Sequence, residues 1–71
     1  MDSPKLYAEQ KHTLNQIQRT LNLDKMYLYR FVGNYDKIVK IPHNVLLAIA
    51  KVEGIGTEEL YEKMLKYAAE K

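Results

Sequence analysis

Apolar residues recur at helical spacing through most of the chain. Leu14, Ile17 and Leu21 follow one another three and four positions apart, which places them on one face of a helix. Thr13 and Gln16 have the spacing of a capping box, in which each side chain bonds a backbone N–H of the other residue. The pattern predicts a helix that starts at Thr13 and runs to about Leu21.

A preceding helix is expected over residues 4–11. Ser3-Pro4 is a helix-start pair, because Ser caps free N–H groups and Pro fits the first helical position. Leu6 is the only strong aliphatic anchor of this stretch.

A very short interruption follows the helix that starts at Thr13. Asn22 tolerates the left-handed conformation that ends helices, and Asp24 is a good N-cap. A third helix is therefore expected over residues 25–33. Its inward residues are Leu28, Phe31 and Val32.

Residues 34–41 are interpreted as a loop, because Gly33 and Asn34 are residue types that favour turns. Within it, Ile38, Val39 and Ile41 pack inward or form a brief extended piece. A short strand here is the main alternative to an all-helical fold.

Two further helices complete the pattern. Pro42 or His43 opens a fourth helix over residues 43–53, which Gly54 is placed to stop. A fifth helix is expected over residues 57–69, and its early acidic residues suit the positive end of a helix dipole.

The fifth helix carries two adjoining apolar rows. One consists of Leu60, Met64 and Tyr67, and the other of Tyr61, Leu65 and Ala68. A core of four other helices does not cover both, so we expect the first row in the core and the second in a homodimer contact. The alternative is a helix that packs broadly and leaves its Tyr hydroxyls in water.

Composition narrows the classes of function. The 71 residues are 46% apolar and fit one domain, 1–71, that is marginally stable alone. There is no cysteine, no apolar run of membrane-spanning length and no signal-peptide pattern, so a cytoplasmic protein without a membrane partner is expected.

Enzymatic chemistry is not expected. No nucleophile is paired with a base, and no glycine loop is suited to phosphate. His12 and His43 are far apart in the sequence and predict a helix junction and a cap position, not a metal site. We therefore predict no catalytic residues, no metal, no cofactor and no small-molecule ligand.

Charge is unevenly distributed along the chain. The net charge is only +2, but residues 25–40 contain four basic residues against Asp36 alone. Residues 53–62 contain four Glu and no basic residue. A basic middle segment favours a nucleic-acid partner.

Two short helices joined by Asn22-Leu23-Asp24 have the arrangement that major-groove binding requires. Residues 13–61 resemble the lambda-repressor/Cro-like (XRE-type) helix-turn-helix family, with the motif itself at residues 13–34. The matching positions are Thr13, Ile17, Leu21, Asn22-Leu23-Asp24, Leu28, Phe31, Pro42, Leu46-Leu47, Ile49-Ala50 and Gly54-Ile55-Gly56-Thr57-Glu58-Glu59-Leu60. The sequence departs from the family at Gln18, where a small Ala is usual, at Val32 and Asn34, and in a longer loop before Pro42.

The resemblance implies a compact five-helix domain that reads duplex DNA with its third helix. On that helix it implies base contacts from Lys25, Met26, Tyr29 and Arg30. The supporting contacts to phosphate or bases would come from Asn15, Gln16, Tyr35, Lys37 and Lys40. Tyr29 is equally compatible with packing, whereas packing is favoured for Tyr27.

The expected function is that of a sequence-specific transcriptional regulator, a repressor by occlusion, encoded by a bacterium, phage or mobile element. The alternative is a protein-interaction module, an anti-repressor or scaffold, that uses the fifth helix through Tyr61, Leu65 and Ala68. RNA binding ranks last, because no sheet platform is predicted on which bases could stack.

Overall fold

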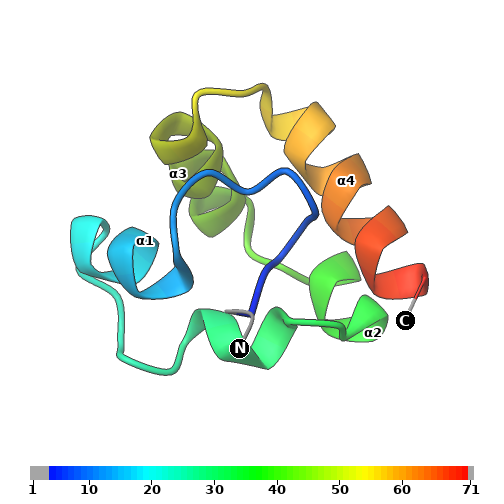
Figure 1. Ribbon diagram of the computed structural model, residues 1–71, viewed down its shortest axis with the longest axis horizontal. Coiled ribbons are helices and arrows are strands. Elements are labelled where there is room, and N and C mark those ends of the chain that lie inside the picture. The colour runs from blue at the N-terminus through cyan, green and yellow to red at the C-terminus, as the bar shows by residue number, and fades with distance from the viewer. Residues whose placement is uncertain (1–3, 71) are drawn as a thin grey trace.

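The computed structural model describes residues 4–70 as four α-helices and one short 3-10 helix (Figure 1). Their bounds are α1 Leu14–Thr20, η1 Leu28–Phe31, α2 Tyr35–Val39, α3 His43–Glu53 and α4 Thr57–Ala69. No strand occurs within residues 4–70, so the all-helical class is confirmed and the alternative of a short strand is wrong. The number and lengths of the first helices differ from the expectation.

Three helix ends follow the predicted local chemistry. The Thr13 hydroxyl accepts from the Gln16 N–H at 3.1 Å, and Gln16 Oε1 accepts from the Thr13 N–H at 3.0 Å. Asn22 follows α1 with a φ of 57°, and Gly54 ends α3 with a φ of 75°. The capping box and both left-handed positions are therefore confirmed.

The expected first helix is absent. Residues 4–12, which we call the strap, form turns and bends instead, and the predicted cap Ser3 lies outside the described residues. The Leu6 N–H donates to Gln10 Oε1 at 2.8 Å, which is a bond to a side chain and not a bond of a helix. With Leu6 and Tyr7 both buried, the strap is fixed by tertiary contacts and not by helical bonds.

The expected third helix shrinks to η1. An α-helix capped by Asp24 would direct the Leu28 N–H to the Asp24 carbonyl, but that N–H donates to Gln18 Oε1 at 2.7 Å. The Asp24 carbonyl instead accepts from Tyr27 at 3.1 Å, and Val32 is already extended. Residues 25–27 are therefore a turn, and only Leu28–Phe31 is helical.

The expected loop at residues 34–41 contains α2. Asn34 acts as its N-cap and accepts from the Lys37 N–H at 3.2 Å, while Asp36 lies in the first turn beside the positive end of the dipole. Ile38 is fully buried. A cap and one buried anchor are enough for a short helix here, because α2 packs against both η1 and α4.

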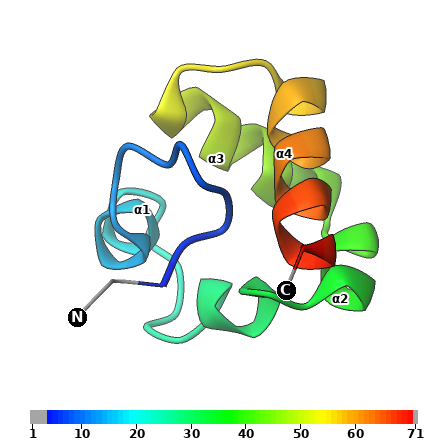
Figure 2. The ribbon, with the colours of Figure 1, turned by 45° about the vertical axis from the view of Figure 1, so that its right-hand side comes forward.

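The core lies where the helices face the strap. α4 packs on α2 and α3, α1 packs on α3 and η1, and the strap lies between α1 and α4 (Figures 1 and 2). From α4 the buried residues are Leu60, Met64 and Ala68, with Tyr61, Leu65 and Tyr67 half-buried beside them. The expected division into two rows is therefore wrong at its last positions, since Ala68 belongs to the core and Tyr67 lies at its margin.

None of the helices found in residues 4–70 has the length and apolar character that crossing a membrane requires.

Candidate nucleic-acid interface

The connection between α1 and η1 is built around the side chain of Gln18. This side chain is 97% buried; its Nε2 donates to the Lys25 carbonyl at 2.8 Å and its Oε1 accepts from the Leu28 N–H. An amide both donates and accepts, so one residue satisfies both sides of the turn. At the position where the lambda-repressor/Cro-like family usually has a small Ala, this chain thus has a polar side chain that bonds both ends of the turn.

Packing gives η1 an inner and an outer side. Leu28 and Phe31 are buried, and Tyr27 lies edge-on to Phe31 with 5.7 Å between the ring centroids. Arg30 is exposed. The predicted packing of Tyr27 is therefore confirmed, and Arg30 is left as the charged side chain on the outer side.

Tyr29 connects η1 to α1 and is half-buried. Its hydroxyl donates to Asn15 Oδ1 at 3.1 Å, and this bond lies at the surface. Gln16, the neighbour of Asn15, uses its carbonyl oxygen in the capping box. Asn15, Gln16 and Tyr29 are thus engaged within the chain while still reaching solvent.

Most of the predicted DNA contacts lie on the surface. The exposed ones are Asn15, Gln16, Lys25, Met26, Arg30, Tyr35, Lys37 and Lys40. Met26 is 56% exposed and Tyr35 46%, so both present apolar surface to the solvent. These residues come from α1, the turn at residues 25–27, η1, α2 and the position directly after α2. The three helical elements adjoin, because α2 packs on η1 and η1 packs on α1 (Figure 1).

A shallow hollow of about 340 Å³ lies beside the turn and contains a residue that the sequence did not single out. It is lined by Asn15, Gln18, Arg19, Leu23 and Lys25. Arg19 lies one helical turn beyond Asn15, and that spacing is the signal that could have found it. The hollow brings two basic side chains and two amide side chains to one place.

The basic residues are spread over the molecule, but one group of them is close together in sequence. The basic surface, which we define as Arg19, Lys25, Arg30, Lys37 and Lys40, is exposed and is interrupted by Asp24 and Asp36. Outside it, the exposed basic residues of the described chain are Lys5, Lys11, Lys51 and Lys66. Glu58, Glu59 and Glu62 are exposed on the first turns of α4. Glu53 does not contribute to this acidic region, because it lies inside the protein.

Glu53 holds the strap in place. Its carboxylate accepts from the Tyr7 hydroxyl, from the Lys11 N–H at 2.7 Å and from the His12 N–H at 3.0 Å. It also accepts from His12 Nδ1 at 2.6 Å. His43 is the first residue of α3, next to the N-cap Pro42 and so near the expected cap position. His12 directly precedes the N-cap Thr13, but the expected junction between two helices is absent there because the first helix is absent. No local signal indicates that Glu53, the last residue of α3, binds the strap.

The ionised form of Glu53 is favoured by these partners. Burial alone would raise the pKa of the Glu53 carboxyl, but the bonds from Tyr7, Lys11 and His12 outweigh it and hold the pKa below its ordinary value. Burial and the nearby Glu53 charge raise the pKa of the Tyr7 hydroxyl. The pair is therefore an un-ionised phenol that donates to a carboxylate.

The predicted dimer residues are only partly available. Ala68 is 94% buried within the chain itself, so it offers no surface to a second copy. Tyr61 and Leu65 are half-buried, and the Tyr61 hydroxyl donates to the Val39 carbonyl at 3.4 Å.

Within residues 4–70, no three His, Asp or Glu side chains are grouped so that they could hold a metal ion. Comparisons of the chain with models of protein families, with curated proteins and with solved structures gave no match.

Proposed function

We propose that the protein binds duplex DNA through its basic surface and acts as a transcriptional regulator. The observation that carries the proposal is the exposure of five basic side chains on α1, the turn, η1 and α2, while the exposed Glu residues of α4 lie elsewhere. Lys and Arg side chains that neutralise phosphates supply most of the affinity of a protein for a duplex.

The short η1 determines how the contacts divide. A single 3-10 turn presents far fewer side chains to a groove than a recognition helix of two or three turns does. Arg30 is the side chain suited to bidentate hydrogen bonding with guanine, and the exposed Met26 is suited to a thymine methyl group. Phosphate contacts by Arg19, Lys25 and the α2 lysines therefore contribute more than base reading.

Salt-dependent binding to labelled duplexes tests the proposal. Fluorescence anisotropy should show affinity for a random-sequence duplex that falls steeply with salt. Arg19→Ala and Lys25→Ala should each weaken binding to every duplex and lower the salt slope by about 1. Arg30→Ala should in addition relax the preference at one base position of a site selected from random duplexes.

Lys66→Ala is the matched control, because Lys66 is exposed on α4 outside the basic surface. It should leave affinity and salt slope unchanged. The proposal fails if the wild type binds no duplex at low salt, or if Lys66→Ala weakens binding as much as Lys25→Ala does.

The proposal concerns the single chain. Burial of Ala68 reduces the surface expected for a homodimer to Tyr61 and Leu65, and it weakens in the same way the alternative of a protein-interaction module centred on those three residues. Dimerisation stays a prediction, and sedimentation equilibrium with and without a palindromic selected site measures it.

A further inference from the structure

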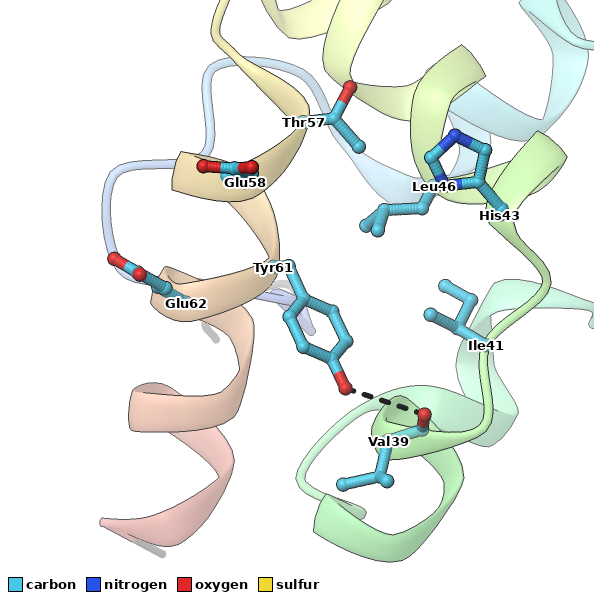
Figure 3. Close-up of a pocket in the computed structure, with 8 residues that line it drawn as sticks. All are labelled: Val39, Ile41, His43, Leu46, Thr57, Glu58, Tyr61 and Glu62. Atoms are coloured by element: carbon cyan, nitrogen blue, oxygen red, sulfur yellow. Dashed lines mark hydrogen bonds between the residues drawn. The ribbon is translucent and has the colours of Figure 1, made fainter.

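A groove opens where α2 ends and where α3 and α4 begin (Figure 3). It adjoins the basic surface at Lys40, which stands between the lining residues Val39 and Ile41. Its volume is about 380 Å³, which is within the usual range of ligand and peptide-anchor pockets. Ile41 and Leu46 form the buried floor, and Val39 and Tyr61 form the apolar walls. The groove is thus large enough for one bulky side chain.

Val39 is the unusual member of this lining. Its side chain is 47% exposed although it stands beside buried aliphatic groups. An exposed apolar wall next to a preformed hollow gains free energy when an apolar side chain of a partner covers it.

One side of the groove is acidic. Glu58 and Glu62 lie one helical turn apart on α4 and both are exposed, while the imidazole of His43 lies on the α3 side (Figure 3). Among the residues that the structure describes, no Lys or Arg lines the groove. The Val39 carbonyl, bonded to Tyr61 at a long 3.4 Å, keeps a second lone pair and adds an acceptor on the α2 side, across the groove from Glu58 and Glu62 (Figure 3).

We propose that this groove is a docking site for a peptide segment of a partner protein that carries a large apolar side chain next to Lys or Arg. The apolar side chain would fill the hollow against Val39 and Tyr61, and the cation would face Glu58 and Glu62. A nucleic acid does not suit the groove, because the two carboxylates repel phosphates. Charge complementarity thus selects a basic, apolar peptide as the occupant.

Selection from a phage-displayed library of random 12-residue peptides tests the proposal with the full chain as bait. The recovered peptides should share a large apolar residue beside Lys or Arg. A synthetic peptide with that consensus should shift the amide signals of Val39 and Tyr61 in the NMR spectrum, while the signals of Lys25 and Arg30 stay in place.

Glu58→Lys and Glu59→Lys form a matched pair. Both reverse a charge in the first turn of α4 and so change the helix dipole interaction alike, but only Glu58 lines the groove. Glu58→Lys should weaken the peptide by about fivefold or more, and Glu59→Lys by less than about twofold. DNA binding should not become weaker in either variant, which separates this proposal from the previous one.

Three outcomes would overturn the docking site. One is a library that yields no shared consensus, or a consensus without a basic residue. Another is equal weakening by the two variants. The third is self-association of the wild type that Glu58→Lys abolishes, because a second copy of the chain would then be the occupant.

Discussion

Gln18 and Glu53 are both buried polar side chains, and each holds a segment that regular helix does not organise. Gln18 bonds residues seven and ten positions ahead and shapes the turn before η1. Glu53 bonds residues between 41 and 46 positions back and fixes the strap. The first therefore organises a local turn, and the second joins distant parts of the chain.

The chemistry of each side chain suits its task. The turn presents one free carbonyl and one free N–H, and the amide of Gln18 both donates and accepts. The strap presents only donors to Glu53, and an ionised carboxylate accepts from all of them. Among residues 4–70, no buried side-chain nitrogen or oxygen is left without a partner. The two sites thus differ in charge, because Gln18 is neutral and Glu53 is ionised. Substitutions that change the charge of either side chain can test this difference.

Glu53→Leu should have the largest effect on stability. It leaves the Tyr7 hydroxyl, two backbone N–H groups and the His12 ring without their acceptor, and we expect a loss of about 3 to 5 kcal/mol in the free energy of unfolding. Urea unfolding followed by circular dichroism measures it. Glu53→Gln, which keeps the shape and one acceptor, should lose less. A loss below about 1 kcal/mol in Glu53→Leu would mean that the strap is held by Leu6 and Tyr7 packing alone.

Gln18→Leu should have an intermediate effect. The volume is nearly kept, but the Leu28 N–H and the Lys25 carbonyl lose their partner, at a cost of about 1 to 3 kcal/mol. The same urea experiment applies. Because no charge is involved, the loss should be equal at pH 5 and pH 7, and a pH-dependent loss would refute the view that Gln18 acts as a neutral clamp.

The pH dependence of stability should distinguish the two sites further. Because the folded pKa of Glu53 lies below its ordinary 4.5, the carboxylate contributes fully above that pH, and its contribution is lost as the pH falls through the lower folded value. The difference in stability between wild type and Glu53→Gln should therefore shrink as the pH is lowered below 4.5.

Gln18→Glu should respond in a different pH range, above pH 4.5. A carboxyl buried against the Lys25 carbonyl has a raised pKa, so this variant should gain stability relative to wild type as the pH falls. Urea midpoints measured from pH 3 to pH 7 check both variants. A Gln18→Glu difference that changes only below pH 4.5, as that of Glu53→Gln does, would contradict the comparison.

Tyr29→Phe should have the smallest effect. Its hydrogen bond to Asn15 lies at the surface, where water replaces a lost partner, and we expect a change of about 0.5 kcal/mol or less. A loss comparable with that of Gln18→Leu would show that η1 is held from outside as well as from Gln18.

Local signals in the sequence were sufficient for the parts of the fold that neighbouring residues determine. Thr13 with Gln16 and the glycine at position 54 act through bonds to their own helix, and α3 and α4 were predicted with their observed bounds. The strap and η1 could not be predicted in this way. The strap depends on bonds from Tyr7, Lys11 and His12 to the distant Glu53, and η1 depends on the bond from the Leu28 N–H to Gln18. Helical spacing in the sequence indicates neither set of bonds.

The candidate site likewise contains residues that local signals identify and residues that they do not. The basic residues of the turn, η1 and α2 were found from their spacing and from the charge of the segment, and they are exposed. Arg19 was missed because a basic residue in the last turn of a helix is ordinarily a solvated charge. Glu53 was counted with the acidic residues of the C-terminal part, since its burial depends on where the strap lies.

The bonds of Glu53 to the strap close the chain into a ring. The ring has more than forty residues and no covalent link, and its closure entropy rises slowly with length, by about 0.6 kcal/mol for each doubling. Inserting a few residues between the exposed Gly33 and Asn34 would therefore cost little in closure and would leave the N-cap of α2 in place, although the same insertion in the strap would break its bonds to Glu53. The molecule thus tolerates a change in the length of the chain between the strap and Glu53 far better than a change in the bonds that join them.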